Sequence, residues 1–209
     1  MRETSIPNVF EENGTIFTRC RDCKSIYGEV VLERGGSCYR LFSPLRSKFA
    51  SSIRLGFRPD IKEEDHILYL GAGAGTTASH ISDSITSGIL YAIEFSPVPF
   101  VKLLSVSEVK RNIFPILQDA QKPRIFGIFI DRVDLVYQDI SQPNQVDIFI
   151  ENMNFFRAER GILMLKSFSL RSDHSPDNEI KKLRKHFRVN QIKDISRFHR
   201  GHLSIFVSS

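Results

Sequence analysis

The chain has 209 residues and a net charge of +5, with 41% hydrophobic and 11% aromatic residues. This length and composition suit one medium domain with a small appendage and exclude a disordered protein. No apolar run is long enough to span a membrane, and no charged-then-apolar N-terminus indicates a secretory signal. The three cysteines, an odd number, argue against a disulfide framework and for a reducing compartment.

The positive charge is concentrated in two segments. Residues 38–58 contain five basic residues and no acid, and residues 176–209 contain eight Lys or Arg against three Asp or Glu. Two basic segments around a nearly neutral middle suit a polyanionic partner that approaches one face. For each segment alone, a solvated helix face is an equally good interpretation.

Residues 1–42 show short alternating runs that are broken by Asn13-Gly14 and Gly35-Gly36. The pattern predicts strands at 9–10, 15–19, 27–32 and 38–41, and hence a small N-terminal antiparallel β domain over 1–42. Ser43-Pro44 then indicates the start of a basic helix that runs to about Ile53, with Ser43 as its cap. We place a second domain over residues 43–209.

In this second domain, strand-like and helix-like segments alternate. We expect helices near 76–86, 97–110, 143–157 and 177–186, and strands at 67–71, 89–94, 113–118, 133–138, 162–167, 189–195 and 202–207. The alternation predicts an α/β fold with an open, mostly parallel sheet. The last two strands are too close for a crossover helix and should be antiparallel. This ending is typical of Rossmann-like methyltransferases rather than of dehydrogenases.

A glycine-rich turn follows the first strand of this domain, in Gly71-Ala72-Gly73-Ala74-Gly75-Thr76-Thr77. Glycine lets backbone amides approach a ligand closely, and the start of a helix leaves such amides unpaired. An acid, Glu94, ends the next strand about 20 residues later, which is typical of a nucleoside-binding βαβ unit. The dinucleotide fingerprint requires a third glycine where this chain has Thr76, so the pattern disfavours NAD.

Acidic residues lie at the carboxyl ends of three predicted strands. Glu94 is placed to accept from both ribose hydroxyls, and Asp119 is placed to accept from an adenine amino group. Asp139 follows the fourth strand. Such acids suit S-adenosylmethionine, which carries a sulfonium and an ammonium, and would repel a pyrophosphate. Helix capping is the alternative explanation for Asp119 and for Asp139.

Motifs in order from about residue 39 to residue 207 resemble the fibrillarin family. They are Tyr39-Arg40, Pro44 to Lys48, Leu68 to Ala72, Gly75 to Thr77, Ser79-His80, Tyr91 to Pro97, Asn112-Ile113, Pro115-Ile116, Asp119-Ala120 before Pro123, Val133-Asp134, and Asp139 to Gln145. Archaeal members are the most similar, because the glycine-arginine-rich tail of nucleolar members is absent.

The resemblance implies a small N-terminal β domain, a Rossmann-like methyltransferase domain and S-adenosylmethionine as cofactor, with no metal. It further implies 2′-O-methylation of ribose in rRNA and tRNA directed by a box C/D guide RNA. The partners would be a Nop-family scaffold protein and a kink-turn-binding ribosomal-type protein, in the cytoplasm of an archaeal cell or the nucleolus of a eukaryote. The implied cofactor-binding residues are Gly71, Ala72, Gly73, Thr76, Thr77, Glu94, Phe95, Asp119, Ala120, Asp139 and Gln142.

The resemblance also assigns a catalytic set of Lys48, Asp139, Lys166 and His202. A lysine near the attacking oxygen can stabilise developing negative charge or accept a proton, and a neighbouring carboxylate can orient the amine. A solvated helix charge for Lys48, a helix cap for Asp139 and a strand-edge position for His202 are the alternative interpretations. Lys166 ends an apolar run, where an unpaired amine would be costly.

Four positions depart from the family pattern. Basic residues after the Glu-Phe motif are replaced by Pro97 to Phe100, a double glycine by Arg160-Gly161, an Asp-His pair by Gly201-His202, and an Ile-Lys-Ala segment by Leu165-Lys166-Ser167. The lost acid weakens the role assigned to His202. The changes leave open a non-catalytic subunit of an RNA–protein particle, and the shared superfold leaves open an NAD-dependent oxidoreductase.

Cys20, Cys23 and Cys38 are three of the ligands that a structural zinc would need, but the sequence offers no evident fourth. We therefore expect reduced cysteines in a hairpin region.

Overall fold

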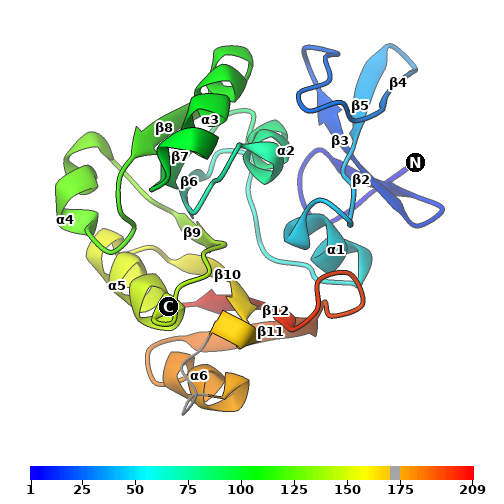
Figure 1. Cartoon of the computed structure of the whole chain (residues 1–209). Helices are drawn as coiled ribbons and strands as arrows, with labels where there is room; N and C mark the ends of the chain where they lie inside the picture. Colours follow the sequence, from blue (N-terminus) through cyan, green and yellow to red (C-terminus); the bar gives the residue numbers. More distant parts are fainter. Residues whose placement is uncertain (170–174) are drawn as a thin grey trace.

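A computed structural model describes residues 1–169 and 175–209 of the chain (Figure 1). Within these residues the strands form two sheets, a small one near the N-terminus and a larger one that carries most of the helices. None of the helices in this part of the chain has the length and apolar composition needed to cross a membrane.

The small sheet is antiparallel, with strand order β1-β2-β3-β5-β4. Its strands are β1 (Arg2–Glu3), β2 (Val9–Glu12), β3 (Thr15–Cys20), β4 (Val31–Arg34) and β5 (Ser37–Leu41). The predicted strand at 27–32 is correct only at residues 31–32, where β4 begins. The Glu29 carboxylate accepts hydrogen bonds from the backbone N–H groups of Ile26 and Tyr27 and folds the segment before β4 into a turn. Gly28 completes the turn with a φ of +86°.

The large sheet has strand order β11-β12-β10-β9-β6-β7-β8, and the strands β6 to β10 are parallel to one another. The C-terminal strand β12 lies between β10 and β11 and is antiparallel to both, which confirms the predicted ending. The strands are β6 (His66–Leu70), β7 (Ile89–Glu94), β8 (Ile113–Leu117), β9 (Leu135–Gln138), β10 (Arg160–Lys166), β11 (Arg188–Asp194) and β12 (His202–Ser208).

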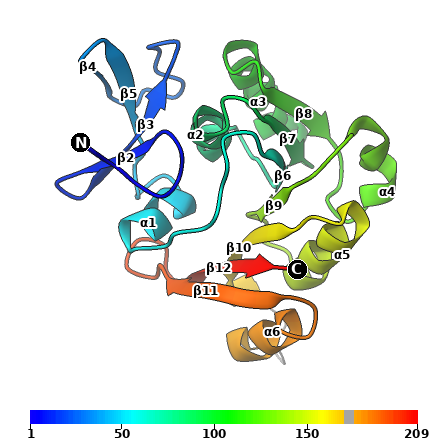
Figure 2. The same cartoon turned by 180° about the vertical axis from the view of Figure 1, so that it is seen from behind.

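Helices cover both faces of this sheet (Figures 1 and 2). Successive strand residues point to opposite faces, so Tyr69 packs in the cluster with the first three helices and Leu70 in the cluster with the others. Both faces are therefore apolar, as expected of a parallel sheet. One face is covered by α1 (Lys48–Arg54), α2 (Thr76–Ser84) and α3 (Pro97–Val109), and the other by α4 (Pro123–Phe126), α5 (Gln145–Phe156) and α6 (Pro176–Leu183).

Helix α1 begins later than predicted. The carbonyl of Ser43 accepts hydrogen bonds from the N–H groups of Arg46 and Ser47, so these residues form a turn before the helix. Ser47, not Ser43, is the cap: its hydroxyl accepts from the N–H of Ala50. The short segments α4, η1 (Gly127–Phe129) and η2 (Ser167–Ser169) were not predicted, because they are too short to show a helical period.

A buried charged cluster joins the small sheet to α2. The Arg40 side chain is fully buried and donates to Glu29 at 2.6 Å and to Asp83 at 2.7 Å. Asp83 also pairs with Lys110 at 2.6 Å. The neighbouring His80 ring, also buried, is hydrogen-bonded to the hydroxyls of Thr18 at 2.7 Å and Tyr27 at 2.6 Å. Removing one member of such a cluster leaves an uncompensated buried charge, so the cluster fixes how the two sheets fit together.

We expect the stability of the fold to fall in mild acid. Burial lowers the pKa of the His80 imidazole well below its usual 6.5, and the charges of Arg40 and Lys110 act in the same direction. Below pH 6.5 the unfolded chain therefore binds a proton that the folded chain does not, and the free energy of unfolding decreases by about 1.4 kcal/mol per pH unit. Urea unfolding at pH 7.5, 6.5 and 5.5 measures this slope. A His80→Gln variant should show a smaller slope, and an equal slope would contradict the assignment.

One cysteine prediction is wrong. Cys23 and Cys38 form a disulfide, with their Cα atoms 5.2 Å apart, and Cys20 is buried as a free thiol. Cys20 and Cys38 are cross-strand neighbours on β3 and β5, and the chain after β3 turns back at Cys23, whose φ is +50°. This turn brings Cys23 close to Cys38. An odd number of cysteines does not exclude one such disulfide.

Candidate active site

The glycine turn after β6 lies directly against the loop that follows β9. Gly71 has a φ of +81°, and a Cβ at this position would lie 2.6 Å from the carbonyl oxygen of Asp139 and from Cγ2 of Ile140. Only glycine fits, so the turn after β6 and the loop after β9 are in direct contact. The N–H groups of Gly71 and Ala72 both donate to the carbonyl of Ile93, which ties the turn to β7 as well.

Glu94 is held in place at the end of β7. One carboxylate oxygen accepts from the N–H of Gly73 at 2.7 Å, and the other accepts from the N–H of Ser96 at 2.8 Å. A carboxylate has about four lone-pair positions, so these two bonds orient the group and leave acceptor capacity for a ligand.

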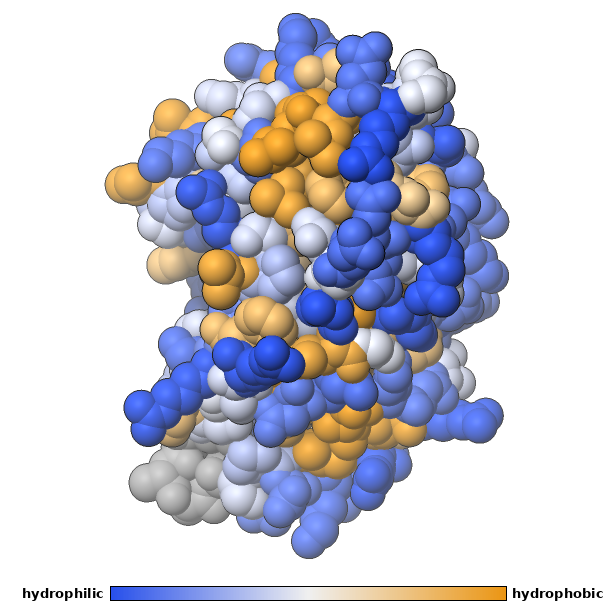
Figure 3. All heavy atoms as spheres, turned by 90° about the vertical axis from the view of Figure 1, so that its right-hand side faces the viewer, coloured by the Kyte–Doolittle hydropathy of each residue, from blue (hydrophilic) through white to orange (hydrophobic). Residues whose placement is uncertain are grey.

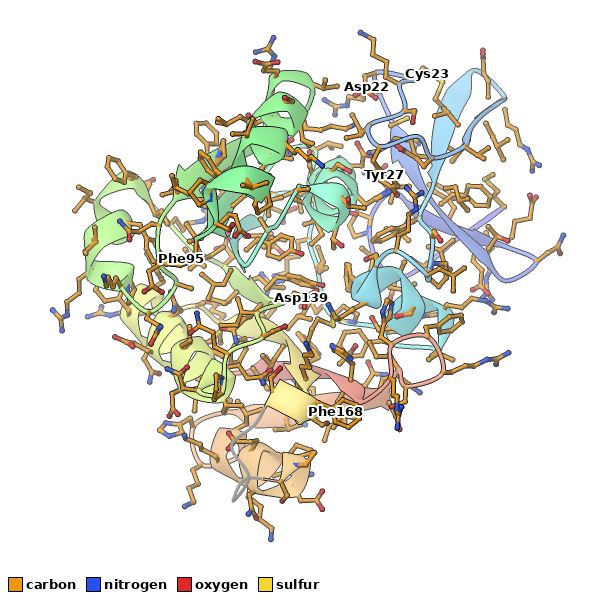
Figure 4. The ribbon with its side chains drawn as sticks, in the orientation of Figure 1. Asp22, Cys23, Tyr27, Phe95, Asp139 and Phe168 are labelled. Carbon is orange, nitrogen blue, oxygen red and sulfur yellow. A yellow bond between two sulfur atoms is a disulfide. The ribbon has the colours of Figure 1, made fainter. Side chains whose placement is uncertain are left out.

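A hollow of about 350 Å³ lies between the glycine turn and the loops that follow β7, β8 and β9. Figure 4 labels two of its residues, Phe95 and Asp139, at this edge of the sheet. Eight of the predicted cofactor-binding residues line it: Gly71, Gly73, Glu94, Phe95, Asp119, Ala120, Asp139 and Gln142. Phe95 is 68% exposed, so its ring is available to a ligand.

Three predicted cofactor residues do not line this hollow. Ala72 and Thr77 are buried, and the Thr77 hydroxyl lies 3.0 Å from the Ser47 hydroxyl at the start of α1. Thr76 lines a separate hollow between the segment near Tyr27 and helix α3. Gln118 and Ser141 line this hollow of about 350 Å³ but were not predicted. Gln118 directly precedes Asp119, and Ser141 follows Asp139 by two residues. Proximity to a predicted acid at a strand end would have identified both.

Lys48 and Asp139 form an ion pair between α1 and the loop after β9. The Lys48 amine donates to both carboxylate oxygens, at 2.9 and 3.0 Å. Both side chains are partly exposed, at 24% and 16%, so the pair lies at the rim of the hollow rather than in the core. Lys48 is the first residue of α1, and the Ser47 cap fixes the helix end that carries it.

Lys166 and His202 complete the predicted set from the antiparallel strands β10 and β12. They are directly opposite each other. The next hydrogen bond runs from Ser167 N–H to the Gly201 carbonyl, so Lys166 and His202 are a non-hydrogen-bonded pair, in which side chains are closest. The Lys166 amine also reaches the Ser141 hydroxyl at 3.5 Å, beside the hollow.

His202 is uncharged at neutral pH. Burial lowers its pKa below the usual 6.5, and the nearby Lys48 charge acts in the same direction. Its Nδ1 is 2.9 Å from the Arg200 carbonyl oxygen, so Nδ1 carries the proton and Nε2 carries the lone pair. The Arg200 carbonyl therefore orients the imidazole ring of His202. In the family pattern an aspartate precedes this histidine, where the chain has Gly201.

Two of the departures from the family pattern have structural explanations. Arg160 pairs with the buried Asp65 at 2.7 Å at the start of β10, far along the strand from Lys166. A Cβ on Gly201 would lie 2.4 Å from the ring of Phe168, and the Arg200 guanidinium lies over that ring at 5.7 Å. None of these contacts involves the side chain of Lys48, Asp139, Lys166 or His202.

The site therefore combines an acidic hollow with two amines and an imidazole at its rim. The hollow suits a cationic nucleoside, and the amines suit an oxygen that becomes negatively charged as it reacts. The structure brings Lys48, Asp139, Lys166 and His202 to this one edge, from α1, the loop after β9, β10 and β12.

Comparison with known proteins gives a consistent result. The fibrillarin family model matches residues 3–209. A fibrillarin-like rRNA/tRNA 2′-O-methyltransferase of Picrophilus torridus is 40% identical over 188 residues, which cover 90% of this chain and 89% of the relative. The Methanococcus jannaschii fibrillarin pre-rRNA processing protein has a TM-score of 0.89 at 33% identity and covers 99% of this chain and 96% of its own.

Two further solved structures bear on the ligand and the partner. The Aeropyrum pernix fibrillarin was solved with natively bound S-adenosyl-L-methionine and matches with a TM-score of 0.80 at 32% identity, covering 92% of this chain and 88% of its own. A fibrillarin/Nop5p complex matches with a TM-score of 0.87 at 37% identity, covering 96% and 97%. The resemblance stated from the sequence motifs is confirmed: this chain belongs to the fibrillarin family.

Proposed function

We propose that the chain is the catalytic subunit of an RNA-guided particle that methylates the ribose 2′-hydroxyl of ribosomal and transfer RNA. S-adenosylmethionine would be the methyl donor. The observation that carries this proposal is the Lys48–Asp139 ion pair at the rim of the acidic hollow, with Lys166 and His202 beside it. The relative of Picrophilus torridus is an rRNA/tRNA 2′-O-methyltransferase, which supports the same reaction here.

The lining of the hollow fits this cofactor. It includes the carboxylates of Glu94, Asp119 and Asp139 and neither lysine nor arginine, so it favours a sulfonium and an ammonium over a pyrophosphate. Glu94 would accept from the ribose hydroxyls and Asp119 from the adenine amino group. When bound, the cofactor supplies an electrophilic methyl carbon.

The chain's own residues would position the attacking hydroxyl and accept its proton. Asp139 holds the Lys48 amine in one place, where its charge stabilises negative charge on the attacking oxygen. Lys166 approaches from β10 and adds a second donor. His202 is neutral and carries its lone pair on Nε2, so it is suited to accept the proton. Holding the oxygen and the methyl carbon in line is the larger part of the rate enhancement.

The two basic segments of the sequence supply a face for RNA. The loop between β11 and β12 packs beside the start of α1, where the ring of His199 is 2.9 Å from the Pro44 carbonyl oxygen. Arg46, Arg197 and Arg200 are exposed in these segments. Hydrophilic side chains cover most of this face, between smaller apolar patches (Figure 3). A nucleic-acid backbone is the partner that such a surface favours.

Sequence selection and assembly would come from other components. A box C/D guide RNA would pair with the target, a kink-turn-binding protein would fold the guide, and a Nop-family scaffold would hold this chain. The fibrillarin/Nop5p complex supports the scaffold. The α3 side chains Val98, Val101 and Leu104 are exposed at helical spacing, and an apolar stripe of this kind suits a protein partner better than an RNA.

The two competing functions account for fewer of these features. In an NAD-dependent oxidoreductase, the three carboxylates around the hollow would repel the pyrophosphate. In a non-catalytic subunit, nothing would require the Lys48 amine to be held by both oxygens of Asp139 next to the cofactor hollow.

Reconstitution tests the proposal. The chain is combined with the scaffold, the kink-turn protein, a guide RNA and a target RNA, and transfer of a radiolabelled methyl group from S-adenosylmethionine is measured. We expect label on the guided nucleotide and none when that nucleotide carries 2′-deoxyribose. Equal labelling of the deoxy target would contradict ribose methylation, and no labelling of the ribose target would favour the non-catalytic subunit.

A further inference from the structure

The buried side chain of Gln145 pairs with the backbone of Lys166. Its Oε1 accepts from the Lys166 N–H at 2.9 Å, and its Nε2 donates to the Lys166 carbonyl at 3.0 Å. The pairing of β9 with β10 ends at Gln138 and Leu163, so no β9 residue is opposite Lys166. The Gln145 amide thus supplies both hydrogen bonds that a longer β9 would have made.

A second amide ties this contact to the loop that carries Asp139. The Nε2 of Gln138, which is also fully buried, donates to the Gln145 carbonyl at 2.6 Å. Gln138 precedes Asp139 directly, and Gln145 follows Gln142 by one turn, with its N–H bonded to the Gln142 carbonyl at 3.1 Å. The two glutamines therefore close the loop over residues 139–144 at its base and join it to the end of β10.

We propose that Gln145 is a positioning residue for methyl transfer: it fixes the Lys166 backbone relative to the loop that carries Asp139. This inference rests on the proposed function. Gln145 does not line the cofactor hollow, so its effect would pass through Lys166 and not through contact with the cofactor. Without the amide, the backbone N–H and carbonyl of Lys166 must find water or other partners, and the strand end shifts as they do so. A misplacement of about 1 Å can reduce a rate by about 100-fold.

The chain offers a matched control at the far side of the same sheet. Gln191 on β11 makes the same kind of bridge: its Oε1 accepts from the Arg58 N–H at 2.8 Å, and its Nε2 donates to the Gly56 carbonyl at 3.1 Å. Its loss removes a pair of hydrogen bonds of the same kind, made by a half-buried side chain, away from the Lys48–Asp139 pair. A comparison of the two glutamines separates positioning from general stability.

The test compares Gln145→Leu, Gln145→Glu and Gln191→Leu in the reconstituted particle. For Gln145→Leu we expect a single-turnover rate about 10- to 100-fold below wild type at saturating S-adenosylmethionine, with the Kd for S-adenosylmethionine within about threefold of wild type. Gln191→Leu should retain the rate within about threefold, with a fall in Tm no larger than that of Gln145→Leu, because the Gln191 side chain is less buried. Gln145→Glu should recover toward wild type as the pH is lowered, because a protonated carboxyl again offers one donor and one acceptor.

Three outcomes would overturn the inference: an unchanged rate for Gln145→Leu, an equal loss in Gln191→Leu, or a ratio of Gln145→Glu to wild type that does not change with pH. Amide hydrogen exchange at Lys166 gives a readout without turnover. Protection should be lost in Gln145→Leu and kept in Gln191→Leu, and equal protection in both would also overturn it. Inactivity of the wild-type particle would count against the proposed function instead.

Discussion

Replacing Asp139 by asparagine is expected to reduce the single-turnover rate of guided methyl transfer by about 10²- to 10³-fold. Asp139 is the group that holds the Lys48 amine, through hydrogen bonds of 2.9 and 3.0 Å to its two carboxylate oxygens. Asparagine keeps the size of the side chain but removes its charge, so the amine loses its orientation. The rate is measured with saturating cofactor, because Asp139 also lines the hollow.

Asp134→Asn is the matched control for this change. Asp134 precedes β9, at the opposite end of the strand that Asp139 follows, and its carboxylate accepts from the His66 N–H at 2.8 Å. The control should lose stability but keep its rate within about threefold. Lys48→Ala combined with Asp139→Asn should be little slower than the slower single variant, because both changes disrupt one interaction. A rate for Asp139→Asn within twofold of wild type would remove this aspartate from the mechanism.

Replacing Glu94 by alanine is expected to weaken S-adenosylmethionine binding by about 100-fold or more, because it removes charge-assisted hydrogen bonds to the ribose. The same change frees the N–H groups of Gly73 and Ser96, which the carboxylate now holds at 2.7 and 2.8 Å, so the glycine turn also loses its orientation. Isothermal titration with the cofactor measures the effect.

Glu108→Ala serves as the control for Glu94, because Glu108 is an exposed acid on α3. It removes the same charge without touching the hollow, and the affinity should be unchanged. If Glu94→Ala and Glu108→Ala weaken binding equally, the net charge of the protein and not the ribose contact accounts for the affinity.

Much of the site could be predicted from the sequence because several of its residues lie at the ends of strands or directly after them. Glu94 ends β7, Asp139 follows β9 and Lys166 ends β10, and the carboxyl ends of parallel strands meet at one edge of a sheet. An apolar run that stops at a charged residue marks such an end without knowledge of the tertiary structure. The resemblance then added roles for Lys48 and His202 that spacing alone does not give.

The features that were missed depend on contacts between distant segments. In the sequence, Gln145 is one more polar residue after Gln142, and only the fold shows its hydrogen bonds to the Lys166 backbone. The Cys23–Cys38 disulfide depends on a turn at Cys23 with positive φ, which no residue pattern marked. The later start of α1 depends on which of two serines, Ser43 or Ser47, can cap the helix. Local sequence preference does not decide such questions.

A crystal structure with bound S-adenosylmethionine is the most direct test of the whole account. We predict the adenosine over Gly71 to Gly75, with its ribose on Glu94, its base near Asp119 and its methyl group facing the amines of Lys48 and Lys166. Cofactor bound in the separate hollow near Tyr27 and Thr76, or a methyl group directed away from both amines, would contradict it.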